Sequence, residues 1–460
     1  MRTKIVCTIG PASSSVTKLK KMIEAGMTVA RVNFSHGDHK SNGILIQNIR
    51  RAAEDLGENI GLMADLQGPR IRVARLSAPI SVKPGQNVVV LKKSSSGSSS
   101  PSTPESDPPA FAIDGARLLK HLKKGDPIFI DNGMLELIVQ GKTKNGINCK
   151  VKTGGTINAR KGLNIPRISP FLTSFTKNDW KSLKFAISRN ADFIAMSFVK
   201  TQKDILNLKK AIKKILPNAR PHELPAVVAK IETSAAVKNF DKILKITDGI
   251  MIARGDLAIE TPQEQVPTLQ KQMIKKCLHN AKPVIVATQM LESMMENPRP
   301  TRAEINDVAN SVIDHTDAVM LSGESALGKY PVKTVQIMKK IATYTETGPY
   351  DDLDYKEIQI KELVPFSLIA RAAVMLAREM QLKNIIIRNA PLAMTYKVSR
   401  FRPEVNIWHL NRNRFESRKL SLAWGVQVID AVRNIKGGYV LIDGVSKDHG
   451  RIEYKISHKV

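Results

Sequence analysis

The chain has 460 residues, of which 42% are hydrophobic and 25% charged, a balance typical of a globular protein that can bury a sizeable core. This length predicts two or three domains. Lysine and arginine total 71 against 42 acidic residues, so the formal net charge is +29. Aromatic residues make up only 5%, which leaves few side chains for base stacking. We therefore expect no nucleic-acid partner and interpret the lysine runs as solvated helix faces that attract anionic substrates.

No apolar run is as long as a membrane span, so we expect no membrane association. The first residues lack the layout of a signal peptide. The three cysteines, Cys7, Cys149 and Cys277, lie far apart and form no CxxC pair. These features predict a cytoplasmic protein with reduced core thiols.

Eight short apolar segments share one pattern: each is rich in Val, Ile, Ala or Met and ends abruptly in polar or charged residues. They lie at 4–11, 29–37, 60–68, 193–200, 226–232, 249–256, 283–290 and 318–325. Continuous apolar runs of this length favour strands that are buried on both faces of a parallel sheet. Segments of helical period separate most of them, as at 17–26 and 268–282. The alternation predicts an α/β fold, a (β/α)8 TIM barrel.

Two other regions interrupt or follow this pattern. Residues 70–166 contain β-like alternation and turn pairs such as Asn145-Gly146, which predict a small inserted β domain. The low-complexity stretch at 94–109 within it is predicted to be a mobile loop. From 346 strands and helices alternate again, which predicts a separate α/β domain. We therefore expect a barrel at 1–69 and 167–345, an inserted domain at 70–166 and a shortened C-terminal domain at 346–460.

Polar side chains follow most of the eight apolar segments. They are Arg31, Asn33, Asp65, Lys230, Glu232, Arg254, Asp256, Thr288 and Ser322. The C-terminal ends of TIM-barrel strands lie together, so we expect these side chains to share one site. Two carboxylates suit a hard divalent cation, and lysine and arginine complement phosphate. Each residue alone is more often structural, but the combination favours phosphoryl transfer over acyl transfer or redox chemistry.

Eight motifs occur in order along the chain. They are 4–13 (KIVCTIGPAS), 30–37 (ARVNFSHG), 65–69 (DLQGP), 230–232 (KIE), 253–257 (ARGDL), 287–293 (ATQMLES), 298–304 (PRPTRAE) and 320–324 (MLSGE). With these motifs the chain resembles pyruvate kinases over nearly its whole length, most densely at 1–75 and 190–345. The resemblance implies a TIM barrel with an inserted small β-barrel lid and a C-terminal α/β domain. It also implies a homotetramer that transfers phosphate from phosphoenolpyruvate to ADP, giving pyruvate and ATP, the final step of glycolysis.

The resemblance also implies roles for single residues. Glu232 and Asp256 would bind Mg²⁺ or Mn²⁺. The catalytic set would be Lys230, Arg31, Thr288 and Ser322, the last two on the path that protonates the enolate. The substrate would contact Arg31, Lys230, Gly255, Asp256 and Thr288, and the nucleotide Arg72, Lys161, Asn33 and His36. Closing the lid would exclude water that competes as phosphoryl acceptor.

Arg70 departs from the family pattern in a way that bears on potassium. Family members that need K⁺ hold it with residues matching Asn33, Ser35, Asp65 and the main chain of Leu66, and they carry a glutamate where this chain has Arg70. A guanidinium is permanently charged. We expect Arg70 to supply the missing charge, either by pairing with Asp65 or by entering the cation pocket, so that K⁺ is not required. The alternative is a solvent-facing Arg70 at the lid hinge.

The C-terminal domain departs most from the family. Its first strand ends in Arg388-Asn-Ala-Pro391, where regulated members have a Ser/Thr/Gly-rich loop that cradles an effector phosphate. The segment after Trp424-Gly-Val426 also lacks the expected helix. Proline has no N–H to donate. The sequence therefore predicts weak or absent activation by sugar phosphates or AMP at this loop.

Two other functions stay open at this point. One is a lyase on the same barrel that acts beside a metal-bound enolate, which would need no lid lysine such as Lys161. The other is a basic, non-catalytic protein built on a decayed kinase, against which Lys230, Glu232, Asp256 and Thr288 all argue.

Overall fold

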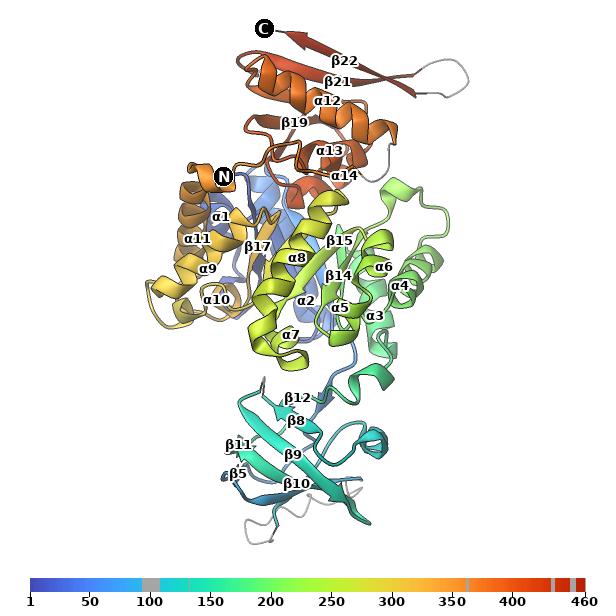
Figure 1. Cartoon of the computed structure of the whole chain (residues 1–460), viewed down its shortest axis with the longest axis vertical. Helices are drawn as coiled ribbons and strands as arrows, with labels where there is room; N and C mark the ends of the chain where they lie inside the picture. The colour runs from blue at the N-terminus through green and yellow to red at the C-terminus, as the bar shows by residue number, and fades with distance from the viewer. Residues whose placement is uncertain (93–107, 132, 361–363, 432–434, 447–451, 460) are drawn as a thin grey trace.

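The structure, a computed structural model, describes residues 1–92, 108–131, 133–360, 364–431, 435–446 and 452–459. Three bodies follow one another along its long axis, with the barrel between the C-terminal domain and the inserted β domain (Figure 1). Most of the predicted mobile loop at 94–109 lies outside these ranges. None of the described helices is long and apolar enough to cross a membrane.

The eight apolar segments form the strands of a closed barrel, which confirms the predicted TIM-barrel fold. The strands are β1 (Lys4–Thr8), β2 (Val29–Asn33), β3 (Gly61–Leu66), β13 (Phe193–Met196), β14 (Ala226–Ile231), β15 (Gly249–Ala253), β16 (Val284–Ala287) and β17 (Ala318–Leu321). All neighbours are parallel, and β1 closes the barrel by pairing with both β2 and β17. Their carboxyl ends therefore meet at one rim.

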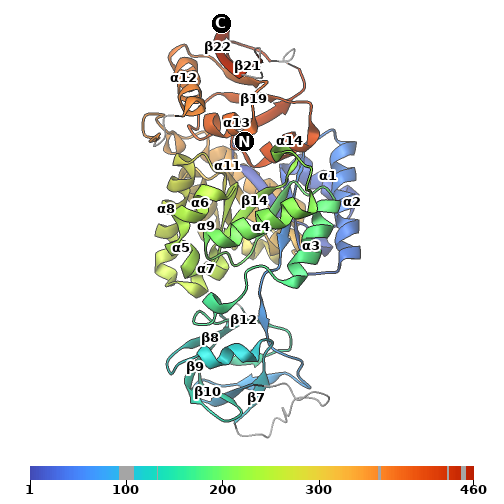
Figure 2. The ribbon, with the colours of Figure 1, turned by 90° about the vertical axis from the view of Figure 1, so that its right-hand side faces the viewer.

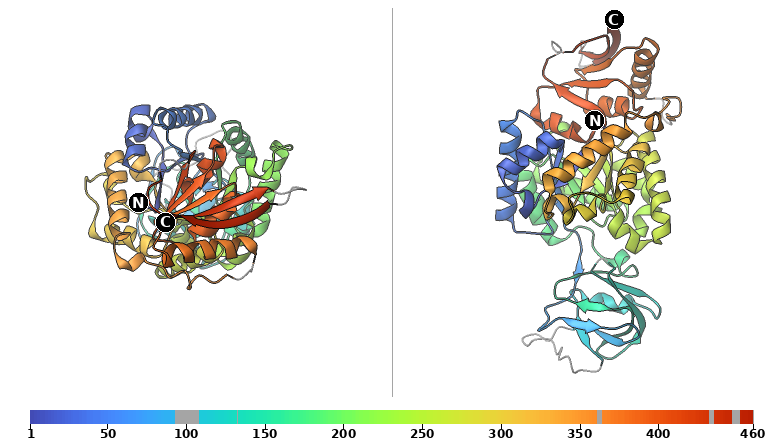
Figure 3. Two further views of the ribbon diagram at one scale, coloured as in Figure 1. Left: turned by 90° about the horizontal axis from the view of Figure 1, so that it is seen from above. Right: turned by 90° about the vertical axis from the view of Figure 1, so that its left-hand side faces the viewer.

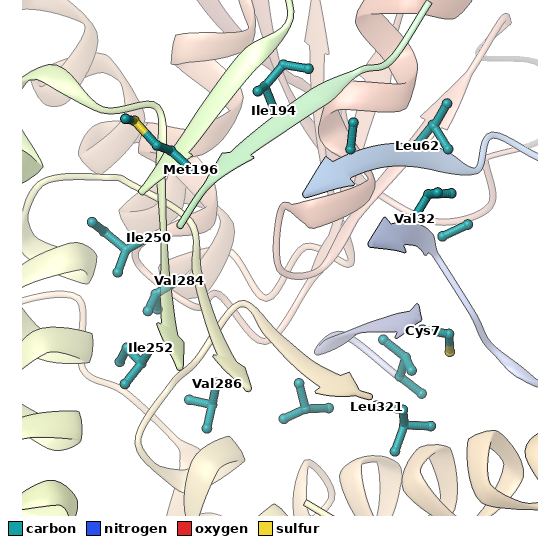
Figure 4. Packing of buried hydrophobic residues seen from close by; sticks show 14 of the residues in the cluster. Cys7, Val32, Leu62, Ile194, Met196, Ile250, Ile252, Val284, Val286 and Leu321 are labelled. Carbon is teal, nitrogen blue, oxygen red and sulfur yellow. The ribbon is translucent and has the colours of Figure 1, made fainter. Parts of the chain in front are cut away.

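Both faces of the barrel strands are buried, which explains why the segments read as continuous apolar runs. Along β13, Ile194 and Met196 belong to the hydrophobic cluster between the strands and the surrounding helices (Figure 4). Phe193 and Ala195 belong instead to the cluster inside the barrel. The strands are thus fixed from two sides and form a stiff support for the side chains that follow them.

The helices surround the barrel (Figure 2). They are α1 (Val16–Ala25), α2 (His39–Asp55), α3 (Lys177–Ser188), α4 (Gln202–Ile215), α5 (Ser234–Lys238), α6 (Phe240–Ile246), α7 (Arg254–Glu260), α8 (Val266–His279), α9 (Arg302–Ile313), α10 (Gly323–Ala326) and α11 (Pro331–Thr345). Local signals set several of their starts. Thr301 caps α9, and Glu304 completes a reciprocal capping box. Helix α7 begins directly at the end of β15, which places Gly255 and Asp256 in its first turn.

The inserted domain, here called the lid, leaves the barrel after β3 and returns after β12. Its strands are β4 (Ile71–Arg72), β5 (Ile80–Val82), β6 (Asn87–Leu91), β7 (Ala110–Ala112), β8 (Pro127–Ile130), β9 (Leu135–Lys142), β10 (Gly146–Thr153), β11 (Gly155–Ile157) and β12 (Gly162–Asn164). Seven form one sheet in the order β4-β12-β8-β9-β10-β6-β7, and β11 pairs with β5. A bridge between Val73 and Ile113 joins the two edges of the large sheet, which curls around its own hydrophobic cluster.

The C-terminal domain covers the amino-terminal end of the barrel (Figure 3). It contains α12 (Pro365–Glu379), β18 (Asn384–Arg388), α13 (Leu392–Ser399), β19 (Asn406–Leu410), α14 (Arg414–Lys419), β20 (Val426–Ile429), β21 (Tyr439–Ser446) and β22 (Ile452–Lys459). Its sheet has the order β20-β19-β18-β21-β22, with β22 antiparallel. Leu422 packs into the inner barrel cluster, and the Lys419 ammonium group donates to the carbonyl oxygens of His222 and Leu224, 2.6 Å away. The carboxyl rim of the strands is left to face the lid.

Candidate active site

A buried carboxylate, Asp65 at the end of β3, joins three other strand ends into one network. Its Oδ2 atom accepts from Arg31 Nε at 2.7 Å and lies 3.1 Å from Lys230 Nζ. Ser197, just beyond β13, donates to Asp65 Oδ1 at 3.2 Å and lies 2.8 Å from the Lys230 amine. Asp65 is 1% exposed. The predicted meeting of side chains from β2, β3 and β14 is therefore present in the structure.

Lys230 also connects this network to Glu232. Its Nζ atom lies 2.9 Å from Glu232 Oε1, and the other oxygen of Glu232 accepts the Phe198 N–H at 2.7 Å. Burial would lower the pKa of Lys230, but Asp65 and Glu232 raise it above its ordinary value. Burial would raise the pKa of Asp65, but Lys230 and Arg31 hold it below its usual range. The amine is therefore held as a cation at the rim of the barrel.

Glu232 and Asp256 form a site that fits a divalent cation. Burial raises the pKa of Glu232, and the negative charge of Asp256 raises it further. A hard cation would relieve this repulsion, and oxygen donors are the ligands that it prefers. In the described part of the chain no group of three or more His, Cys, Asp or Glu side chains could hold a metal. Two carboxylates leave coordination positions for water and phosphate oxygens, as is usual for Mg²⁺.

The loop after β16 is strained and firmly held. Thr288 and Gln289 have φ angles of +72° and +56°, which is unusual for a β-branched residue such as threonine. The Gly255 N–H donates to Thr288 Oγ1 at 2.8 Å. Arg254 donates to the Thr288 carbonyl at 2.8 Å, and Asp307 holds its guanidinium through two contacts of 2.6 and 2.7 Å. The two residues predicted to hold a substrate carboxylate, Gly255 and Thr288, are thus in direct contact.

Ser322, at the end of β17, is supported by Glu324. The Ser322 N–H donates to Glu324 Oε2 at 2.7 Å, and the Leu291 N–H donates to the other carboxylate oxygen at 3.2 Å. Burial raises the pKa of Glu324. The hydroxyl oxygen of Ser322 is buried and has no hydrogen-bond partner within the described structure. It therefore has hydrogen-bonding capacity available for a ligand or water.

Two predicted nucleotide contacts lie on the lid. Lys161 precedes β12 and is 2.8 Å from the Asp131 carboxylate. Arg72 lies on β4, which pairs with β12, and donates to the Arg160 carbonyl at 3.2 Å. A third, His36, follows β2 on the barrel. Burial lowers the pKa of His36, and the charges of Arg70, Arg72 and Arg31 lower it further, so lid and barrel cations converge there.

Of the four residues proposed to hold a monovalent cation, Asn33, Asp65 and Leu66 use their oxygens within the chain. Asn33 Oδ1 accepts the Ser35 N–H at 3.0 Å, and the Leu66 carbonyl accepts from Ser197 at 2.7 Å. Asp65 is occupied by Arg31 and Lys230.

Arg70 lies against the lid instead of pairing with Asp65. A Cβ atom built on Gly162 would be 3.5 Å from Arg70 Nε. No Arg70–Asp65 ion pair occurs among the residues that the structure describes, so that possibility is not realised.

Comparison with known proteins agrees with this geometry. Residues 1–335 match the family described as "Pyruvate kinase, barrel domain". The pyruvate kinase of Bacillus licheniformis is 41% identical over 433 residues, which is 92% of this chain and 71% of the relative. That of Geobacillus stearothermophilus is 39% identical over 434 residues, 94% of this chain and 72% of the relative.

The chain belongs to the pyruvate kinase family. As a member of that family it is a phosphotransferase, and the predicted family and enzyme class are confirmed. The family match over 1–335 covers every candidate catalytic and metal-binding residue.

Sequence reasoning missed several residues of this pyruvate kinase site. Ser197 had a detectable signal, since it follows an apolar segment as the other site residues do. Glu324 is the last residue of the motif at 320–324, and its support of Ser322 was not predicted. Asn164 of the lid donates to Asp256 Oδ1 at 3.4 Å, and nothing in its local sequence indicates this contact. Glu260, the last residue of α7, also contacts the return segment of the lid through Ser169.

Glu260 generates a prediction about stability and pH. Burial raises its pKa from the ordinary 4.5 to about 7, and the charge of Asp256 adds to this effect. An acid with a raised pKa stabilises the fold below its ordinary pKa, and that stability is lost as the pH rises through about 7. In EDTA, Glu260→Gln should therefore raise the thermal unfolding midpoint at pH 8 by about 2–4 °C and leave it unchanged at pH 5.

Differential scanning calorimetry at both pH values measures this effect. Glu264→Gln, at an exposed position just beyond α7, is the control and should change neither midpoint. An equal shift at pH 5 and pH 8 would show that the gain does not come from ionisation of Glu260.

Proposed function

We propose that this pyruvate kinase family member transfers the phosphoryl group of phosphoenolpyruvate to ADP, giving pyruvate and ATP in the cytoplasm as the final step of glycolysis. The observation that carries the proposal is the buried lysine, Lys230, held within 3.1 Å of both Asp65 and Glu232 at the carboxyl rim of the barrel. A fixed cation beside a carboxylate pair is the arrangement that stabilises charge on a transferring phosphoryl group.

The chain's own groups would position the substrate. Arg31 is held in place by Asp65 and by Thr8, so its guanidinium offers a fixed positive charge to the phosphate. The Gly255 N–H now donates to Thr288 Oγ1, and the Thr288 hydroxyl donates to the Ala287 carbonyl at 2.6 Å. Both donors would be redirected to the substrate carboxylate. Ser322, with its free buried hydroxyl, would hold a proton near the enolate carbon. Catalysis of this kind depends on positioning and charge neutralisation more than on covalent chemistry.

Glu232 and Asp256 would hold Mg²⁺ or Mn²⁺ between them. The bound ion would neutralise negative charge on the phosphate and enolate oxygens. The lid would complete the nucleotide site with Arg72 and Lys161, while Asn33 and His36 would contribute from the barrel. For Lys161 this requires release from Asp131, an ion pair that is 43% and 33% exposed and therefore weak. Lid closure would also exclude water as a competing acceptor.

Lys230→Met tests the proposal. Loss of the cation should lower turnover by at least about 1000-fold, because the divalent ion and Arg31 do not replace the amine beside the transferring phosphoryl group, while phosphoenolpyruvate still binds through Arg31. Pyruvate formation in a coupled assay and calorimetric titration with phosphoenolpyruvate measure the two effects. Lys209→Met, which breaks the ion pair of Lys209 with Asp248 on the outside of the barrel, is the matched control.

Removing Lys230 also leaves Glu232 without its ion-pair partner, a change that can destabilise a fold. Circular dichroism must therefore show that the variant is folded. A folded variant with near-normal turnover would remove the basis of the proposed mechanism.

We further propose that the enzyme needs no monovalent cation. Support comes from the positive charges of Arg70, Arg72 and Arg31 near His36, whose pKa burial lowers and these charges lower further. Support also comes from the internal partners of Asn33 Oδ1 and the Leu66 carbonyl. Arg70 would supply its charge from the lid hinge beside Gly162 instead of through an ion pair with Asp65.

Activity at saturating Mg²⁺ should accordingly be nearly the same with tetramethylammonium as with K⁺ as the counter-ion. Arg70→Glu should create a potassium requirement, because it replaces the cation by an anion at the same place. Arg167→Glu is the control: Arg167 lies 3.9 Å from Asp126 of the lid, and the charge reversal there should stay independent of potassium. An unmodified enzyme that is inactive without K⁺ and fully restored by it would refute the role of Arg70.

The loop after β18 has no free arginine for an effector. Arg388 Nε lies 3.1 Å from Asp443 Oδ1, and a second nitrogen contacts the other carboxylate oxygen. A cavity of about 1180 Å³ lies beside this loop, between the C-terminal domain and the barrel. Two of the lysines that line it are also engaged, Lys282 with the Thr247 carbonyl and Lys209 with Asp248.

Sugar phosphates and AMP should therefore activate the enzyme less than about twofold at subsaturating phosphoenolpyruvate, because the Asp443 carboxylate beside Arg388 would repel a phosphate and Pro391 has no N–H to donate to it. Steady-state rates with and without each compound measure this. Arg378→Gln, which removes a comparable surface pair with Asp354, is the control for Arg388→Gln. Strong activation that Arg388→Gln abolishes and Arg378→Gln leaves intact would contradict the prediction.

The homotetramer expected from the sequence remains part of the proposal. Strand β22 is at the edge of its sheet, with one side unpaired in the described chain. Leu368 and Met375, seven residues apart on α12, are 46% and 41% exposed. An unpaired edge and an exposed apolar stripe favour self-association through the C-terminal domain. Multi-angle light scattering would measure the assembly.

A further inference from the structure

We propose that Asn164 is a positioning residue through which the lid orients the Asp256 carboxylate and so controls divalent-metal affinity. The inference rests on the proposed function, because it takes Glu232 and Asp256 as the metal site. Asn164 is the last residue of β12, and its Nδ2 atom donates to Asp256 Oδ1 at 3.4 Å. The contact joins the lid directly to the barrel helix α7.

The two carboxylates of the site are held in different ways. Glu232 is 1% exposed and is fixed by two barrel groups, the Lys230 amine and the Phe198 N–H. For Asp256, the amide of Asn164 is the one side-chain or main-chain donor found within the described structure. The orientation of one ligand is therefore set by the barrel and that of the other by the lid.

Helix α7 meets the lid at both of its ends. At its start, Asp256 accepts from Asn164. Near its end, a Cβ atom built on Gly133, in the turn between β8 and β9, would lie 3.9 Å from Ile259. The last residue of α7, Glu260, forms a hydrogen bond with Ser169, which lies on the segment that follows β12 and leads from the lid back to the barrel. The backbone of α7 is held by the barrel, since Gly255 donates to Thr288 and Leu257 is buried in the barrel cluster. The lid therefore acts on the half-buried side chains of this helix, such as the Asp256 carboxylate, and not on its backbone.

A distance of 3.4 Å is at the long end of the hydrogen-bond range, which suits a contact that breaks when the lid swings away. Groups that orient metal ligands commonly contribute 10- to 100-fold to metal affinity. If lid position changes the orientation of Asp256, linkage requires that a bound metal favours the lid position seen here by the same factor. The lid is then coupled to the metal site as well as covering the substrate.

The test replaces Asn164 by leucine, which keeps the size of the side chain and removes the amide. Mn²⁺ binding to the full chain without substrates, followed by electron paramagnetic resonance, should weaken about 10-fold or more. At saturating Mn²⁺ the turnover of Asn164→Leu should return to within about twofold of the unmodified chain, because only the metal affinity is lost. Asn158→Leu is the control, since Asn158 donates to Thr156 inside the lid at 3.3 Å.

The outcomes separate this inference from the function on which it rests. If the unmodified chain and Asp256→Asn bind Mn²⁺ equally, the metal site of the proposed function is wrong. If binding depends on Asp256 but Asn164→Leu matches the unmodified chain, the function stands and the role of Asn164 is refuted. If Asn164→Leu and Asn158→Leu weaken Mn²⁺ binding equally, the cause is a general loosening of the lid, and the specific role of Asn164 is refuted as well.

Discussion

The geometry of the site depends on the burial of Asp65 between two cations. An isolated carboxylate that is 1% exposed would be very costly, and Arg31 and Lys230 compensate for it at 2.7 and 3.1 Å. Because all three side chains leave different strands of a closed barrel, none can move without exposing an unpaired charge to the interior. The same ion pairs that satisfy Asp65 thereby fix a guanidinium and an amine where a phosphate would bind. The ion pairs that compensate for burial of Asp65 are therefore the same contacts that orient Arg31 and Lys230 for a substrate.

The network around Asp65 is held entirely by the barrel, whereas the neighbouring Asp256 carboxylate is not. The barrel strands are packed on both faces, and the C-terminal domain covers their amino-terminal end through residues such as Leu422. At the carboxyl rim, Thr288 adopts a positive φ and its carbonyl accepts a hydrogen bond from Arg254. The Asp256 carboxylate, by contrast, accepts its one hydrogen bond in the described chain from a lid residue. The barrel therefore orients most of the site, and the lid contributes to the orientation of one carboxylate.

Sequence patterns predicted the barrel well because burial on both faces leaves a continuous apolar signal, and all eight segments became strands. The rim residues were predictable for the same reason, since each follows a strand directly. Strand β22 (Ile452–Lys459) was not predicted, because it alternates polar and apolar residues and includes four charged or histidine residues. Asn164 and the final position of Arg70 depend on how the lid meets the barrel. That contact joins residues 92 positions apart and leaves no periodicity in the sequence.

The charges at the rim differ between the barrel and the lid. Asp65, Glu232 and Asp256 carry three negative charges, and Arg31 and Lys230 balance two of them, so the barrel part of the site keeps an unbalanced carboxylate that favours a divalent cation. A divalent cation bound there would reverse the sign of this charge and would favour polyanionic substrates. Arg70 and Arg72 add positive charge from the lid side near His36, whose pKa burial lowers and these charges lower further. The barrel side of the rim therefore favours a cation, whereas the lid side favours anions, and a substrate that carries both a metal and a phosphate would match the two together.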